Sequence, residues 1–353
     1  MKHVYPADIV LEISRSKPSK QCAQAISLVA SFIPFEHTRN FLLQLLMLDV
    51  SETCIEGITH RIGKKLYHDA WLKGRHPYGF HRESDKPKEL YIQTDGSMVP
   101  ICGEKSVEYK ENKLGIVYKD TDIVHNKSKT GKEKVEIQNK RYVSSLGEGV
   151  DKYKKMLYAQ CLEQGAKKAE EIIILGDGAA WINKFKEEYF PNAVQILDWY
   201  HATEHLWDTA RILFGENNIK KCEEWISPLQ ALIWDGKIDA VIEKLTQEAL
   251  SRKSKRTALF ELRGYYVSNK NHMKYNEYRS KGYNIGSGAI ESANKYIVAQ
   301  RLKLSGMQWT ISHANAIIHL RCKYYEGYWE EFWDDMNIKD YLDHNLLQME
   351  KVA

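Results

Sequence analysis

Three acidic side chains stand where chemistry is expected in an α/β protein. Asp95 follows the apolar segment 90–92, Asp177 follows the apolar segment 172–175, and a glycine comes directly after each aspartate. Glu291 lies near the start of a predicted helix. Ligand sites in α/β sheets gather beyond the carboxyl ends of strands, and a neighbouring glycine lets the backbone approach a ligand closely. Three carboxylates at such an edge could bind two Mg²⁺ or Mn²⁺ ions, polarise a phosphodiester and activate water or a 3′-hydroxyl.

The alternative for each aspartate is a simple turn, because a single Asp-Gly pair most often marks one. Two such pairs, each after an apolar strand and followed by a glutamate on a later helix, form a less accidental pattern. The pattern therefore favours a metal site made by Asp95, Asp177 and Glu291.

A further aspartate and a histidine follow the next apolar segment, 193–197. Asp198 and His201 are three residues apart, so both side chains could face the same edge of the sheet. They could supply an additional metal ligand, a carboxylate–histidine pair behind the metal ligands, or a DNA contact. Alternatively, Asp198 caps the next helix, and His201 and His205 are neighbours on that helix.

Basic and amide side chains accompany Glu291 on its predicted helix. Asn294 and Lys295 come three and four residues after Glu291 and share its face, and Arg301 and Lys303 lie further along. Such a helix could hold DNA by its phosphates. The alternative is an ordinary solvated basic face, which is the usual meaning of lysine and arginine on a helix.

The elements that must position these residues begin with helices. Apolar periodicity predicts three of them, over about 20–33, 36–48 and 52–68. Ser51 is a natural N-cap for the third helix. The second and third resemble a helix-turn-helix in which Lys64 and Lys65 would contact DNA, and a plain three-helix bundle is an equal alternative. Residues 1–75 are therefore predicted as a helical, candidate DNA-binding region, followed by a polar linker over 76–88.

The next part of the chain alternates between strand and helix patterns. Strands are predicted over 89–94, 114–118, 140–145, 171–178 and 193–198. Helices over 150–168 and 180–189 precede the fourth and the fifth strand. Residues 126–139 are rich in lysine and predict an exposed loop or hairpin tip. Three strands followed by alternating helix and strand predict a mixed α/β sheet with the element order of the ribonuclease-H-like fold.

Helical patterns return over 200–266, and a final long helix is predicted over 289–304. The predicted core is therefore interrupted. Its first part covers 89–200, an all-helical insertion covers 201–285, and the last core helix with C-terminal helices covers 286–353.

Composition sets limits on the function class. The 353 residues include 51 Lys and Arg against 47 Asp and Glu, so the net charge is 51 − 47 = +4, which neither demands nor excludes a nucleic-acid partner. With 43% hydrophobic and 28% charged residues, the composition is globular and excludes wholesale disorder. The six cysteines form no Cys-x-x-Cys pair, and no apolar run approaches the roughly 18 residues of a membrane helix. We therefore expect a cytoplasmic protein without a membrane partner.

Four segments together resemble bacterial insertion-sequence transposases of the ISKra group. They cover residues 176–182, 195–207, 286–291 and 300–309, and they include Gly-Asp-Gly, Asp-Trp-Tyr-His and Gly-Ser-Gly-Ala-Ile-Glu. The resemblance extends back to 31–36 and so covers nearly the whole chain. Members of this group are DDE transposases with a ribonuclease-H-like core and are distantly similar to Mutator-like enzymes.

The resemblance implies that Asp95, Asp177 and Glu291 are the DDE triad, with spacings of 177 − 95 = 82 and 291 − 177 = 114 residues. Asp198 and His201 match an Asp/Cys-x-x-His signature near the start of the insertion. The implied cofactors are two Mg²⁺ or Mn²⁺ ions. The implied partners are double-stranded DNA, as transposon ends and target, and further copies of the chain on nucleoid DNA.

Two alternatives remain open from the sequence. Members of the group usually carry an N-terminal cysteine-rich, zinc-ribbon-like portion, which is not found here, so the chain could be a truncated or catalytically dead DNA-binding remnant. It could also be a ribonuclease-H-like nuclease that does not transfer strands.

Overall fold

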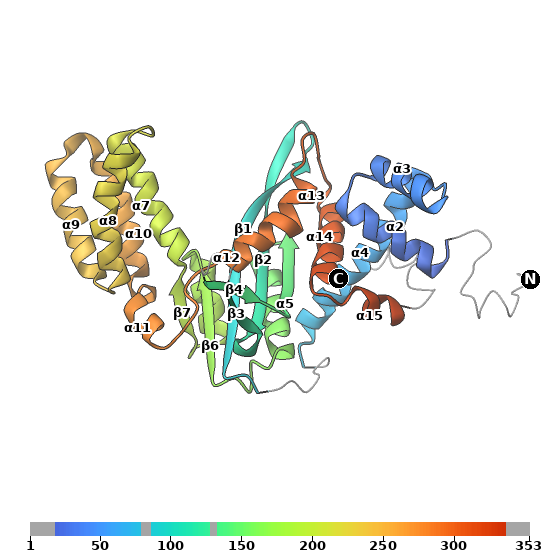
Figure 1. Ribbon diagram of the computed structural model, residues 1–353, viewed down its shortest axis with the longest axis horizontal. Helices are drawn as coiled ribbons and strands as arrows, with labels where there is room; N and C mark the ends of the chain where they lie inside the picture. Colours follow the sequence, from blue (N-terminus) through green and yellow to red (C-terminus); the bar gives the residue numbers. More distant parts are fainter. Residues whose placement is uncertain (1–17, 79–85, 128–132, 337–353) are drawn as a thin grey trace, which may run out of the picture. The chain divides into compact units, whose positions relative to one another are not determined.

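The computed structural model describes residues 18–78, 86–127 and 133–336. The chain divides into two compact units. Unit 1 comprises Met1–Lys86, Asp95–Lys168 and Glu291–Ala353, and unit 2 comprises Pro87–Thr94 and Ala169–Ile290. Part of the predicted linker, 79–85, and part of the predicted lysine-rich loop, 128–132, lie outside the described residues. Helices and strands are combined in both units, so the predicted α/β class is confirmed (Figure 1).

A five-stranded mixed sheet has the strand order β5-β2-β1-β6-β7. Strand β1 (Glu89–Cys102) pairs in parallel with β6 (Glu171–Gly176), and β6 pairs in parallel with β7 (Val194–Leu197). The side chains of Ile173, Ile174 and Leu175 are completely buried. A strand with parallel neighbours on both sides is covered on both faces, which explains why its apolar residues are consecutive rather than alternating.

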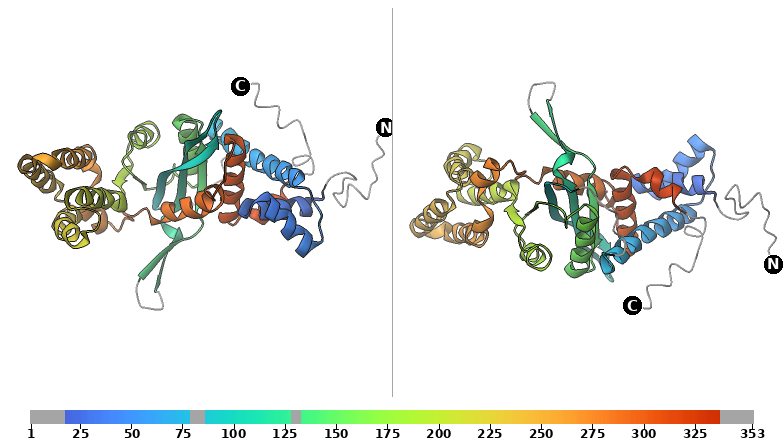
Figure 2. Two further views of the ribbon diagram at one scale, coloured as in Figure 1. Left: turned by 90° about the horizontal axis from the view of Figure 1, so that it is seen from above. Right: turned by 90° about the horizontal axis from the view of Figure 1, so that it is seen from below.

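The other two strands of the sheet are antiparallel. Strand β2 (Val107–Lys119) pairs with β5 (Arg141–Leu146), with Leu114 opposite Ser144. The predicted strand over 114–118 covers only the buried end of β2, because the residues before it are mostly charged and exposed. Strands β3 (Ile123–Lys127) and β4 (Glu133–Ile137) form a separate two-stranded hairpin where a loop or hairpin tip was expected. Figure 2 shows this hairpin projecting away from β2 and β5.

The N-terminal helices belong to unit 1. They are α2 (Lys20–Phe32), α3 (Phe35–Leu46) and α4 (Glu52–Arg75), and Ser51 caps α4 by accepting the Cys54 N–H at 3.3 Å. Helix α4 continues beyond its predicted end at residue 68 as far as Arg75, and Gly74 in this extension is buried. It packs on α14 (Ile311–Tyr325), and α5 (Val150–Glu163) and α15 (Trp329–Asp334) complete the helices around this core.

Helices α4 and α14 approach each other closely at Gly63. A methyl group there would lie 2.3 Å from the Ala316 carbonyl oxygen, whereas one at Gly57 on the same helix would meet nothing within 4 Å. We expect Gly63→Ala to reduce the free energy of unfolding by about 1–3 kcal/mol through overpacking. Gly57→Ala should raise it by about 0.5–1 kcal/mol, because alanine favours helix. Urea unfolding of both variants tests this, and equal shifts would contradict the close packing.

A buried histidine on α14 makes the stability of unit 1 depend on pH. Burial lowers the pKa of His319 from 6.5 to about 4, and its Nε2 lies 3.1 Å from the Ser144 carbonyl oxygen. The unfolded chain therefore binds an additional proton between these pH values, so stability present above pH 6.5 is lost as the pH falls towards 4. His319→Gln should flatten this slope in urea titrations at pH 4.5–7. An unchanged slope would show that His319 does not contribute to it.

Every regular helix after β7 up to residue 280 belongs to unit 2. These helices are α7 (Trp199–Phe214), α8 (Ile219–Trp234), α9 (Ile238–Ser251), α10 (Arg256–Asn269) and α11 (Tyr275–Ser280). Tyrosine hydroxyls join them: Tyr275 donates to the Leu197 carbonyl at 2.9 Å, and Tyr266 donates to the Ala202 carbonyl at 2.8 Å. Among the residues that the structure describes, no helix combines the length and the apolar composition that a membrane crossing requires.

The predicted long helix after residue 288 is divided. It consists of α12 (Gly288–Ala293), a π-helix (Asn294–Ala299) and α13 (Gln300–Leu302). Arg321 on α14 donates to the carbonyl oxygens of two π-helix residues, to Ile297 at 2.8 Å and to Tyr296. A π-helix leaves backbone carbonyls without regular partners, so a buried guanidinium stabilises it.

Candidate active site

The parallel strands of unit 2 end at one edge of the sheet. Gln93 on β1 is in register with Leu175 on β6, and Gly176 is in register with Leu197 on β7. Asp177 follows Gly176 directly, and Asp198 follows Leu197 directly. Asp177 therefore lies just beyond β6, which is the position where ligands bind in α/β sheets. Asp95 comes two residues after Gln93 but lies within β1, because this strand continues to Cys102 rather than ending at the predicted residue 94.

Asp177 occupies a tight turn after β6. Its Oδ1 accepts the Ala179 N–H at 2.9 Å, and its carbonyl oxygen accepts the Tyr265 hydroxyl at 3.0 Å. Gly178 has φ +88°, and a Cβ there would lie 2.6 Å from the Asn269 side chain, so only glycine fits this position. Burial, together with the charge of Asp177, raises the pKa of Tyr265 and keeps its hydroxyl a donor.

Asp198 is the N-cap of α7, as the second alternative for this residue expected. The side chain is completely buried; Oδ2 accepts the His201 N–H at 2.9 Å and Oδ1 accepts the Ser287 N–H at 2.6 Å. Burial raises the pKa of Asp198, and these backbone hydrogen bonds oppose the shift. The His201 ring lies close to Glu204, with Nδ1 3.5 Å from its carboxylate. Asp198 therefore contacts His201 through its backbone and joins α7 to the segment 284–287.

The segment 284–287 is also held by β1. Gln93 Nε2 donates to the Gly286 carbonyl at 3.4 Å, and Tyr91 accepts the Asn284 N–H at 3.4 Å. Trp199 at the start of α7 donates its N–H to Ile285 at 3.1 Å. Since this segment leads directly into α12, it fixes where the helix that carries Glu291 begins.

In unit 1, the structure brings Asn294 to Asp95. Asn294 Nδ2 donates to Asp95 Oδ2 at 2.7 Å, and Asn294 is only 9% exposed. Asn294, predicted to contact DNA, therefore contacts a proposed metal ligand instead. Glu291 lies three residues earlier and is exposed, as are Lys295 and Lys303. Burial lowers the pKa of Lys303, and the charge of Asp95 opposes this shift.

Arg301 does not have the position predicted for a DNA contact. It is 1% exposed, and its Nε donates to the Ala30 carbonyl at 3.1 Å, while the guanidinium lies 4.8 Å from the centre of the Trp309 ring. Burial lowers its pKa to about 10. The guanidinium is occupied by the protein itself, so Arg301 is withdrawn as a candidate DNA contact. Lys64 and Lys65 are half-buried on α4, and Lys65 pairs with Asp69 at 3.3 Å.

Sequence reasoning missed Arg321, which holds the π-helix. Its signal was available, because an arginine within the apolar run 316–322 is unusual unless it is buried with partners. The roles of Tyr265 and Asn269 left no such signal, since both stand among ordinary helical residues.

A metal centre is not assembled within the described residues. Within those ranges, no group of three or more His, Cys, Asp or Glu side chains lies close enough to hold a metal ion. The three predicted ligands are divided between the units, with Asp95 and Glu291 in unit 1 and Asp177 in unit 2.

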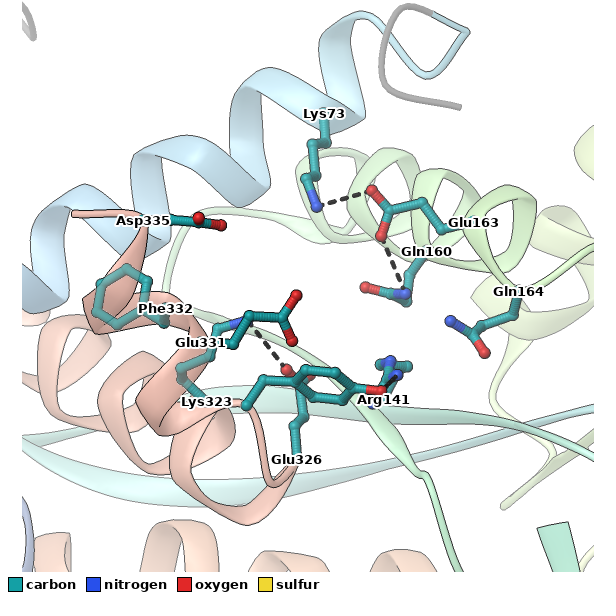
Figure 3. Close-up of a pocket in the computed structure, with 11 residues that line it drawn as sticks. Lys73, Arg141, Gln160, Glu163, Gln164, Lys323, Glu326, Glu331, Phe332 and Asp335 are labelled. Atoms are coloured by element: carbon teal, nitrogen blue, oxygen red, sulfur yellow. Dashed lines mark hydrogen bonds and ion pairs between the residues drawn. The ribbon is translucent and has the colours of Figure 1, made fainter. Parts of the chain in front are cut away.

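A polar cavity of about 440 Å³ lies elsewhere in unit 1 (Figure 3). Its charged side chains bind one another: Lys73 pairs with Glu163 at 2.7 Å, and Lys323 pairs with Glu326 at 3.4 Å. The described residues that line this cavity include none of the three predicted metal ligands, Asp95, Asp177 and Glu291. This cavity is therefore not the candidate active site.

Comparison with models of known protein families shows to which family the chain belongs. The model of the uncharacterised protein family UPF0236 matches residues 2–332. The chain belongs to the UPF0236 family. A search of solved structures matches the UPF0236 chain to the Drosophila P element transposase strand transfer complex, with 10% identity, 98% of this chain and 88% of that chain covered, and a TM-score of 0.29. No curated protein matches it significantly.

Proposed function

We propose that this UPF0236 protein is a DDE transposase that cuts and joins DNA strands at the ends of an insertion sequence. The observation that carries the proposal is the parallel register of β1 and β6, from which Asp95 and Asp177 follow at equal distance along the chain. Asp177 just beyond β6 and Asp95 at the equivalent register position within β1 would suit a shared ligand. Glu291, on the helix that segment 284–287 introduces, would complete the triad.

The sheet supports a ribonuclease-H-like core. Its strand order is β5-β2-β1-β6-β7. On one side of β1 lie β2 and β5, which are antiparallel to each other, and on the other side lie β6 and β7, which are parallel to each other. The motifs over 176–182 and 286–291 support assignment to the ISKra group.

The donor set fits hard divalent cations. Asp95, Asp177 and Glu291 offer carboxylate oxygens, which Mg²⁺ and Mn²⁺ prefer, and the buried Asn294 Oδ1 next to Asp95 has no hydrogen-bond partner among the described residues. Bound ions would polarise the phosphodiester and lower the pKa of an attacking water or 3′-hydroxyl. The chain's own part is to orient Asp95 through Asn294 and Asp177 through its turn. Asp198 would support the site by fixing segment 284–287, which leads into the helix that carries Glu291.

Double-stranded DNA is the proposed partner, and Lys295 and Lys303, exposed near Asp95 and Glu291, are the proposed phosphate contacts. Because two transposon ends must be held together, we also propose that the protein acts as an oligomer on DNA.

A cleavage assay tests the proposal. The full chain is incubated with DNA that carries the element's own boundaries, in Mg²⁺ or Mn²⁺ and in EDTA, and with a labelled pre-cut 3′ end. Metal-dependent nicking at the boundary and joining of the labelled end are the expected results. Nicking without joining would identify a nuclease, and binding without metal-dependent nicking would identify a catalytically dead remnant.

A further inference from the structure

The side-chain amide of Asn294 makes a hydrogen bond through its NH₂ group, while its carbonyl oxygen has no hydrogen-bond partner among the described residues. Nδ2 donates to Asp95 Oδ2 at 2.7 Å, while Oδ1 is buried and has no hydrogen-bond partner among the described residues. The assignment of the two amide atoms follows from chemistry, because an ionised carboxylate only accepts hydrogen bonds and so must face the NH₂ group. Nδ2 therefore faces Asp95, and Oδ1 is the amide atom that has no hydrogen-bond partner among the described residues.

A buried carbonyl oxygen without a donor is unfavourable, and a bound ion is one of the reasons for which a protein keeps such an oxygen. Asn294 is 9% exposed, and it lies one helical turn after Glu291. Within unit 1, the Asn294 amide thus lies next to the Asp95 carboxylate on β1 and one helical turn after Glu291. Oxygen atoms of this kind are the ligands of Mg²⁺ and Mn²⁺.

The local backbone is adapted to this position. Asn294 is the first residue of the π-helix, and π-turns inside helices are frequent at functional sites. Arg321 binds the Tyr296 and Ile297 carbonyls, which fixes the rotation of the helix just after Asn294.

We propose that Asn294 is a positioning residue of the metal site: Nδ2 orients Asp95, and Oδ1 is an additional oxygen donor towards the divalent cation. This inference rests on the proposed function. The competing explanation is that Asn294 only stabilises the fold by binding Asp95, in which case Oδ1 has no role.

The test measures Mn²⁺ affinity of the full chain bound to duplex DNA, by calorimetry, for the wild type and for Asn294→Leu, Asn294→Asp and Asp95→Asn. Loss of groups that orient metal ligands typically weakens metal binding about 10–100-fold. We expect Asn294→Leu to weaken Mn²⁺ binding at least about tenfold. Asn294→Asp, which keeps oxygen donors, should retain more affinity than Asn294→Leu. DNA binding in EDTA should be unchanged in both.

A matched control uses Asn315, a buried asparagine whose amide binds the backbone of Leu146 through both groups. Asn315→Leu should lower stability without weakening Mn²⁺ binding. If Asn294→Leu binds Mn²⁺ like the wild type while Asp95→Asn does not, the inference fails and the proposed function stands. If Asn294→Leu and Asn294→Asp lose affinity equally, Oδ1 has no role. If the wild type binds no Mn²⁺, or Asp95→Asn has no effect, the proposed metal site itself fails.

Discussion

Asp95→Ala is expected to abolish metal-dependent DNA cleavage while leaving DNA binding largely intact. The proposed role of Asp95 is to hold divalent cations that offset charge in the transition state, a contribution of several kcal/mol. At 1.36 kcal/mol per factor of ten, this corresponds to a loss of roughly 10³-fold or more in the rate. Single-turnover cleavage in Mg²⁺ and a binding assay in EDTA measure the two quantities separately.

A matched control for Asp95→Ala is Asp235→Ala. Asp235 is an exposed aspartate at the end of α8 that pairs only loosely with Lys237, at 3.4 Å. Its replacement should change neither cleavage nor binding. Normal cleavage by the Asp95 variant would refute the assignment of the triad, and joint loss of cleavage and binding would indicate a folding defect instead.

Arg321→Met is expected to cause the largest loss of stability among single substitutions in unit 1. The guanidinium is 1% exposed and donates to three backbone carbonyls, of Ile297 at 2.8 Å, Ser31 at 2.7 Å and Tyr296. Methionine fills much of the volume but satisfies none of these acceptors, and each buried unsatisfied group costs about 1–3 kcal/mol. We expect the free energy of unfolding to fall by about 3–5 kcal/mol, as urea denaturation would show.

Lys323→Met provides the comparison on the same helix. Lys323 is partly exposed and pairs with Glu326 at 3.4 Å, so its loss should cost no more than about 1 kcal/mol. Equal destabilisation by the two substitutions would show that the bonds from Arg321 to the π-helix and to α2 contribute little.

Sequence alone predicted the elements whose pattern is local. The consecutive apolar residues 172–175 indicated a strand, and the structure places β6 there, with β1 and β7 in parallel on its two sides. The turn at Asp177 was one of the two alternatives, because a glycine directly after an aspartate most often marks a turn. Asp198 left two alternatives open, and the structure shows it as a helix cap whose other oxygen binds Ser287, 89 residues away.

The burial of Arg301, the π-helix and the position of Asn294 could not be predicted, because they depend on contacts between residues far apart in the sequence. Arg301 and Lys303 look alike in sequence, yet Arg301 is buried against α2 and Lys303 is exposed. The π-helix requires a guanidinium from residue 321, and a helical period cannot reveal that. Asn294 shares a helix face with Glu291 in an ideal α-helix, but the contact with Asp95 removes it from the solvated surface.

The two buried arginines have a consequence for chimaeras built from this family. Arg301 and Arg321 bind the Ala30 and Ser31 carbonyls in the last turn of α2, so the C-terminal part of unit 1 completes the end of an N-terminal helix. The first 75 residues are therefore not expected to be exchangeable between relatives as an independent segment. Exchanging them with those of a relative would leave Arg301 Nε and Arg321 Nη1 buried without their acceptors unless the exchanged helix ended at the same residue and at the same angle.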